Sequence, residues 1–167
     1  MLEIFSETEK IGIYAIAKRR PKIWRKFLEL AHEIMYVESQ LPQLQKELIG
    51  AYVSKEFRCD FCHLGHLDVV EALGGPEAKA LVSEPSADIK PLFDLADKVA
   101  ENALADIHVQ KFLDVGHSDK AVEDVILVTA LFGFANRMVT GFGIEYNQQR
   151  DQESSKQLAK GYVKAPT

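Results

Sequence analysis

The sequence predicts an all-α fold, and three observations point to it. Apolar residues recur three and four positions apart in one segment after another, which is the spacing of one helix face. The alternation of apolar and polar residues that is typical of strands is scarce. Proline and glycine stand where these segments begin and end. Because 167 residues can bury a core and no linker divides them, we predict a single domain over residues 1–167.

Three predicted helices fill the first half of the chain. The first follows Pro21, and its apolar residues are Ile23, Trp24, Phe27, Leu28, Leu30, Ala31, Ile34 and Met35. The second begins near Pro42, which suits a first-turn position, and its apolar residues are Leu44, Leu48, Ile49, Tyr52 and Val53. The third carries both cysteines and ends at the stop signal of residues 74–76. We expect the aromatic residues of the first helix to belong to the core.

The second half contains two more predicted helices and a polar tail. Residues 91–105 are amphipathic. After a turn near Gly116, Ser118 is a candidate N-cap for a helix that runs to about Gly141. That helix is apolar around most of its surface, so we expect it to be buried against the rest of the fold or another subunit. The predicted core covers about residues 21–146, and residues 147–167 form a polar C-terminal tail, either a short surface helix or partly disordered.

Composition and charge argue against several classes of function. The composition is 47% hydrophobic and 27% charged, as in ordinary globular proteins. A net charge of −5 argues against a nucleic-acid partner, and we interpret the basic residues within 18–26 as a solvated helix face. The longest apolar run, residues 125–135, is much shorter than the roughly 18 residues of a membrane span. Residues 1–10 lack a signal-peptide pattern, so we expect a cytoplasmic protein with no membrane partner.

Both cysteines lie in one short motif. Cys59, Cys62 and His66 are spaced so that on a helix, at about 100° per residue, they fall within roughly a sixth of a turn of one another. We expect both cysteines in the first turns of their helix, where the helix N-terminus and nearby cations lower the pKa of a thiol. A second thiol can then close a disulfide with an oxidised first thiol. This arrangement suits peroxide reduction, with an external dithiol restoring the pair.

An upstream glutamate extends the motif into a family pattern. Glu47, eleven intervening residues and Cys59-x-x-Cys62-x-x-x-His66 resemble the core of the carboxymuconolactone decarboxylase superfamily, and most closely its alkylhydroperoxidase D (AhpD) branch. Residues 132–143 are similar to the final core helix of these proteins. The resemblance implies an AhpD-like helical domain of about seven or eight helices, usually assembled as a homotrimer or homohexamer. It also implies a thiol peroxidase for hydrogen peroxide or organic hydroperoxides, active in antioxidant defence with no cofactor or bound metal.

The resemblance further implies a role for each residue of the motif. Cys62 would be the peroxidatic cysteine and Cys59 its disulfide partner. Glu47 and His66 would form the relay that takes the thiol proton and protonates the leaving oxygen. The partner that restores the thiols would be a dithiol reductant of thioredoxin-like or lipoyl type.

The sequence departs from the family pattern at one position. Phe61 stands directly before the second cysteine, where the best-known members have a histidine. His63 directly follows that cysteine instead, and is a candidate accessory residue through which the relay is rerouted.

The same residues allow other interpretations. Residues 59–63 match the C-x-x-C-H motif of c-type haem attachment, which normally follows export. Two cysteines with His63 and His66 supply four zinc ligands of the right kind. Both cysteines would also fit as inert core residues, because free cysteine is often buried. Alternatively, Glu47 and His66 would serve as acid and base in a decarboxylase or lyase of small lactones, with the cysteines incidental. A non-catalytic helical module that binds metal or senses redox state stays open as well.

Overall fold

Helices make up the regular structure of the chain in a computed structural model that describes residues 11–37 and 39–162. The α-helices of this part are α2 (Tyr14–Arg19), α3 (Pro21–His32), α4 (Gln43–Glu56), α5 (Asp60–Gly74), α6 (Lys90–Ala100), α7 (Asp106–Asp114), α8 (Asp119–Gly141) and α9 (Gln148–Gln157). A π-helical turn, Glu33–Val37, prolongs α3, and 3-10 segments cover Pro76–Val82 and Leu158–Lys160. The predicted all-α fold is confirmed.

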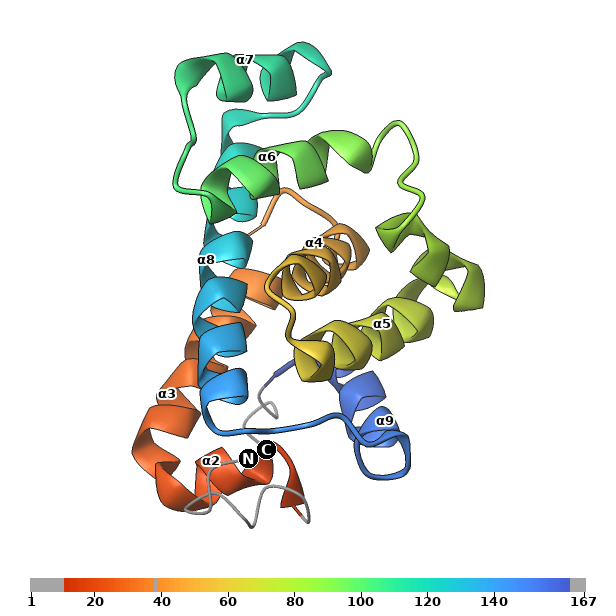
Figure 1. The fold of residues 1–167 in the computed structure, drawn as a ribbon. Helices are drawn as coiled ribbons and strands as arrows, with labels where there is room; N and C mark the ends of the chain where they lie inside the picture. The colour runs from red at the N-terminus through yellow and green to blue at the C-terminus, as the bar shows by residue number, and fades with distance from the viewer. Residues whose placement is uncertain (1–10, 38, 163–167) are drawn as a thin grey trace.

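The long helix α8 runs along one side of the fold, and α4 packs between it and α5 (Figure 1). Helix α6 packs on α8 and α4 towards one end, where α7 follows it. Helices α2 and α3 lie towards the other end, and α9 packs against α5. The core lies where α4, α5, α6 and α8 meet, and its fully buried side chains include Leu48, Ile49, Val70, Leu92, Val125 and Val128. Burial of this apolar surface is the main force that holds the helices together.

Sequence signals at helix ends were partly right. Ser118 caps α8 as predicted, because its side chain accepts a hydrogen bond from a backbone N–H of the first turn. Pro42 is the N-cap of α4 rather than a residue of its first turn. Helix α6 ends before Leu104, because Asn102 has a φ of 54°, which lies in the left-handed region and stops the helix. The predicted extension of that helix to Ala105 is therefore wrong.

Helix α8 is buried on one side and exposed on the other. Val125 and Val128 are fully buried, as the apolar sequence predicted. Leu127 and Phe134 are instead about half exposed, at 49% and 53%. Assembly into a trimer or hexamer stays a prediction. In the part of the chain that the structure describes, no helix combines the length and apolarity needed to cross a bilayer.

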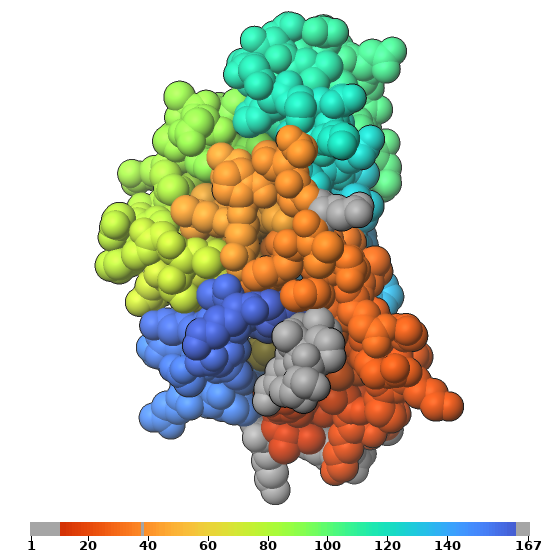
Figure 2. Space-filling model, turned by 180° about the vertical axis from the view of Figure 1, so that it is seen from behind, coloured from red at the N-terminus to blue at the C-terminus, as the bar shows by residue number. Residues whose placement is uncertain are grey.

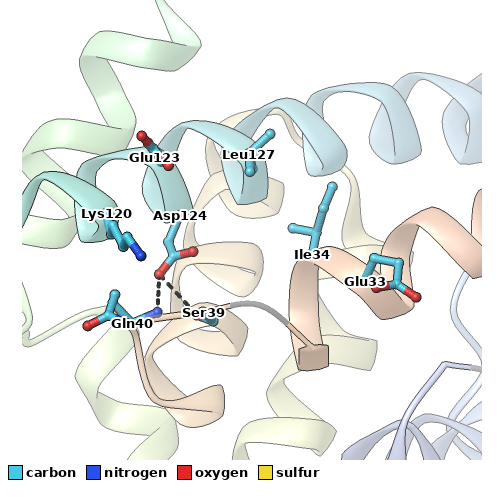
Figure 3. A pocket seen from close by; sticks show the side chains of 8 residues that line it. All are labelled: Glu33, Ile34, Ser39, Gln40, Lys120, Glu123, Asp124 and Leu127. Carbon is cyan, nitrogen blue, oxygen red and sulfur yellow. Dashed lines mark hydrogen bonds between the residues drawn. The ribbon is translucent and has the colours of Figure 1, made fainter.

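A buried carboxylate on α8 fixes the loop that leads into α4. Asp124 accepts hydrogen bonds from the backbone N–H groups of Gln40 (2.7 Å) and Leu41 (3.0 Å), and from Ser39 Oγ (3.0 Å). Figure 3 shows Asp124 pointing from its helix towards this loop, beside a cavity of about 520 Å³. Because the loop continues into α4, Asp124 sets where α4 starts relative to α8.

The C-terminal segment contains a short helix, α9, which is one of the two forms predicted for residues 147–167, and this helix packs onto the fold; residues 163–167 lie outside the described residues. Helix α9 lies on α5, and two of its polar residues are buried. The hydroxyl of Tyr36 donates a hydrogen bond to the carbonyl of Leu158, and Gln43 Nε2 donates one to the carbonyl of Ala159 (3.2 Å). Seen from behind in Figure 2, this blue segment lies beside the orange surface of the N-terminal half. Residues 148–160 thereby lie next to α4 and α5.

Candidate active site

The two cysteines lie at the N-terminus of α5. Cys62 is in the first turn, as predicted, but Cys59 is the N-cap residue, with non-helical φ and ψ of −104° and 88°. Arg58, immediately before it, has a φ of 56°, and the N–H of Cys59 donates to the carbonyl of Ser54 (3.0 Å). A tight turn from α4 to α5 therefore holds Cys59. Both cysteines are buried, carry free thiols and are hydrogen-bonded to each other.

The hydrogen bond between the thiols separates their pKa values. Cys59 accepts hydrogen bonds from the thiol and backbone N–H of Cys62 and from the hydroxyl of Thr140, and together these lower the pKa of Cys59 to about 6. The pKa of Cys62 is raised well above its ordinary value, because its thiol donates to Cys59 and is buried. The two thiols therefore titrate as a coupled pair, in which the hydrogen bond favours the thiolate on Cys59.

The packing of α4 against α5 brings Glu47 and His66 into contact. His66 Nδ1 lies 2.6 Å from Glu47 Oε2, and Glu47 is fully buried. Because Nδ1 is engaged, Nε2 is the ring nitrogen available for proton exchange. The ring of Phe132 from α8 contacts the His66 ring in a T-shaped geometry, with the centroids 4.5 Å apart. The structure thus brings together the two residues that the sequence pattern paired.

A mostly apolar cavity of about 240 Å³ is lined by both Cys62 and His66. Its walls come from α3, α5, α8 and the C-terminal segment, and include Trp24, Phe27, Phe61, Leu131, Met138 and Tyr162. Trp24 and Phe27 pack against the core, as predicted, and also line this cavity. An apolar molecule in this cavity would lie beside a thiol and an imidazole.

Cys59 borders a different and larger space. A groove of about 850 Å³ is lined by Cys59, Thr140 and polar residues of the loops around them, including Arg58, Asp60, Glu145 and Tyr146. Phe61 lines both this groove and the apolar cavity, so its side chain lies between the two. The residue that departs from the family pattern thus forms a wall between the surroundings of the two thiols.

Tyr162 of the C-terminal segment joins the Glu47–His66 pair. Its hydroxyl donates to Glu47 Oε1 at 3.3 Å, and its ring lies nearly parallel to the His66 ring, with the centroids 6.3 Å apart. Burial and the nearby Glu47 raise the pKa of Tyr162 well above its usual value, so the phenol keeps its proton. Sequence reasoning missed Tyr162, because it lies 115 residues from Glu47 in a segment whose polar composition predicted a tail.

His63 and Asn136 brace the helices around the site. His63 does not line the apolar cavity, and its Nδ1 hydrogen-bonds with the carbonyl of Ala51 on α4 (2.9 Å). Asn136 Oδ1 accepts a hydrogen bond from Ser54 Oγ (3.0 Å), while its buried Nδ2 has no partner among the described residues. Both contacts join α4 to a neighbouring helix, α5 in one case and α8 in the other.

The histidines of the motif are arranged for hydrogen bonding within the protein. Nδ1 of His63 is used by the Ala51 carbonyl, and Nδ1 of His66 by Glu47. Among residues 11–37 and 39–162, no three His, Cys, Asp or Glu side chains are grouped closely enough to hold a metal ion.

Two solved structures share this arrangement of helices over most of their length. One is an uncharacterized peroxidase-related protein from a Silicibacter species, 21% identical, with a TM-score of 0.70 over 87% of each chain. The other is described as an alkylhydroperoxidase AhpD core, an uncharacterized peroxidase-related protein from Ralstonia eutropha. It is 21% identical with a TM-score of 0.76, over 89% of this chain and 84% of that one. No family model and no curated protein matches the sequence. The chain has the all-α AhpD-like fold that its cysteine motif predicted.

Proposed function

We propose that this chain is a thiol-dependent peroxidase that reduces hydrogen peroxide or organic hydroperoxides through a dithiol–disulfide cycle. One arrangement carries the proposal: Cys62 is hydrogen-bonded to a second thiol and lines the same cavity as a histidine paired with a buried glutamate. Two adjacent thiols supply the two electrons that reduction of a peroxide requires. The fold shared with peroxidase-related proteins is consistent with this activity.

In the first step, Cys62 attacks a peroxide bound in the apolar cavity. Its proton, which the resting thiol donates to Cys59, would pass to Nε2 of His66 across the cavity that both residues line, and Glu47 would stabilise the resulting imidazolium. A bond forms between Cys62 Sγ and one peroxide oxygen as the O–O bond breaks. His66 then protonates the departing oxygen, so that the products are an alcohol or water and the sulfenic acid of Cys62.

In the second step, the Cys59 thiolate attacks the Cys62 sulfur. The S–S bond forms as the S–O bond breaks, and the departing hydroxide takes a proton to become water. The backbone N–H of Cys62 and the hydroxyl of Thr140 also donate to Cys59 and lower its pKa, and both contacts remain when the Cys62 thiol has been oxidised. An external dithiol then reduces the disulfide and becomes a disulfide itself. We place its approach in the groove beside Cys59, because that groove is larger than the cavity beside Cys62.

A thiol titration before and after one equivalent of peroxide tests the proposal. In the wild-type chain we expect both thiols to disappear together and to return after treatment with a dithiol. Mass spectrometry of the oxidised protein should show a loss of two hydrogens, with Cys59 and Cys62 joined within one chain. If both thiols survive peroxide and the purified protein carries stoichiometric zinc, the metal-binding module is the better explanation and the peroxidase is excluded.

A further inference from the structure

Each oxygen of the buried Glu47 carboxylate has its own hydrogen-bond partner. Oε2 faces His66 Nδ1 at 2.6 Å, and Oε1 accepts from the Tyr162 hydroxyl at 3.3 Å. Among the described residues, the Tyr162 hydroxyl is the group that donates a hydrogen bond to Oε1. Glu47 is 0% exposed, so solvent water does not reach Oε1 to take the place of the Tyr162 hydroxyl. A buried carboxylate oxygen without a hydrogen-bond donor is unfavourable.

Specific contacts hold Tyr162 in this position. Gly161, directly before it, has a φ of 117°, a conformation that favours glycine and turns the chain towards the site. The preceding turn is fixed by Tyr36, which hydrogen-bonds to the Leu158 carbonyl. The ring of Tyr36 also packs edge-on against that of Tyr162, with the centroids 5.8 Å apart. Residues 158–161 are therefore anchored before Tyr162 reaches Glu47.

We propose that Tyr162 is a positioning residue of the proton relay: its hydroxyl orients the Glu47 carboxylate so that Oε2 faces His66. This inference rests on the proposed function, and it makes the C-terminal segment part of the active site. Without the phenol, Oε1 of Glu47 loses its donor and the carboxylate is free to rotate towards another one. That rotation weakens its hold on His66, and hence the ability of His66 to accept the Cys62 proton.

Tyr162→Phe tests the role of the hydroxyl, because it removes that group and leaves the ring. We expect kcat/KM for peroxide to fall about tenfold, the effect of losing one hydrogen bond to a charged group. Tyr52→Phe is the matched control, since it removes a phenol that donates to both oxygens of Asp97 at 3.0 Å on the α4–α6 side. The control should leave turnover unchanged.

A double-mutant cycle with Glu47→Gln separates positioning from packing. If Tyr162 acts through Glu47, Tyr162→Phe should cause no further loss of turnover once Glu47 is already Gln. If Tyr162 only supports the fold, Tyr162→Phe should reduce kcat/KM by the same factor with Glu47 and with Gln at position 47. That additive result would overturn the proposal.

A second readout does not depend on peroxide. In a Cys59→Ser background, the rate at which iodoacetamide alkylates Cys62, measured against pH, reports deprotonation of that thiol. Tyr162→Phe should slow this alkylation about tenfold at neutral pH, again only while Glu47 is present. If the wild type consumes no peroxide but this coupling is found, the peroxidase proposal alone fails. If peroxide is consumed and Tyr162→Phe changes neither rate, the assignment of Tyr162 alone fails.

Discussion

His66 Nδ1 lies 2.6 Å from Oε2 of Glu47, a carboxylate that is fully buried on the neighbouring helix. Burial of a carboxylate is unfavourable unless it is paired and hydrogen-bonded, so the imidazole helps to keep Glu47 in the interior. In return, the carboxylate fixes the orientation of the ring and leaves Nε2 for proton exchange. Proton transfer at Cys62 should therefore depend on this pair.

Glu47→Gln should reduce kcat/KM for peroxide by roughly 10²-fold, the lower end of what general acid–base groups contribute. The amide keeps the volume of the side chain but carries no negative charge to stabilise an imidazolium. The pH profile of turnover should change with it. Steady-state kinetics across the pH range measure both effects, and an unchanged profile would remove Glu47 from the mechanism. Glu71→Gln is a suitable control, because Glu71 pairs with Lys79 and Lys156 outside the apolar cavity.

Single cysteine variants should distinguish the roles of the two thiols. Cys62→Ser should abolish turnover, because the serine hydroxyl is a poor nucleophile towards peroxide. Cys59→Ser should stop after one reaction and leave a sulfenic acid on Cys62, since no second thiol is present to form the disulfide. Mass spectrometry after trapping with a sulfenic-acid reagent locates the oxidised sulfur. A sulfenic acid on Cys59 in the Cys62→Ser chain would reverse the two roles.

The pKa of Cys59 should depend on the thiol of Cys62. In the wild type, alkylation of Cys59 should rise with pH around a midpoint of about 6, since only the thiolate reacts. Cys62→Ala removes the main hydrogen-bond donor to the thiolate, so the midpoint should move upwards, towards the ordinary value. Cys62→Ser retains a donor, because a hydroxyl is a stronger donor than a thiol, and its midpoint should stay well below that of Cys62→Ala. Peptide mapping after timed alkylation gives each midpoint, and an identical midpoint in Cys62→Ala would contradict the assignment.

Gly50→Ala should destabilise the fold by about 1–3 kcal/mol, the usual cost of overpacking a core. A Cβ at Gly50 on α4 would overlap the ring of Phe132, which is buried and packs against His66. Denaturant unfolding measures the change in the free energy of unfolding. Gly141→Ala is the control and should keep its stability, because among the described residues no atom outside its chain neighbours and its own helix backbone lies within 4 Å of the added methyl group. Equal effects at both positions would indicate that the close approach of α4 and α8 is unimportant.

Asp124→Ala should reduce the free energy of unfolding by about 2–4 kcal/mol, because it leaves backbone N–H groups of the loop before α4 without their acceptor. Those groups belong to Gln40 and Leu41, and Leu41 is buried. Glu123→Ala, in the same cavity wall, should have an effect within about 0.5 kcal/mol, as for other surface substitutions. Chemical denaturation of both variants provides the comparison, and similar losses would argue against the loop contact.

Patterns along the chain predicted much of the fold. The helical spacing of apolar residues and the capping serine Ser118 predicted α8 and its start correctly. These patterns were less informative where the backbone conformation of one residue sets a helix boundary. Asn102, with its positive φ, ends α6, and Cys59 precedes α5 as its N-cap. Local conformations of this kind depend on surrounding contacts that a periodic pattern does not contain.

The sequence by itself determined that Cys62 and His66 lie on one helix face, because four residues separate them, and the family pattern added the upstream Glu47. It also predicted Cys59 on that face, whereas Cys59 is the N-cap of α5 and lines a separate groove. Only the tertiary structure decided which groups complete that site. Tyr162 reaches Glu47 from the far end of the chain, and Phe61 separates the surroundings of Cys62 from those of Cys59. The physical reason is that helix spacing specifies neighbours within one helix, whereas contacts between distant segments are set by how the helices pack.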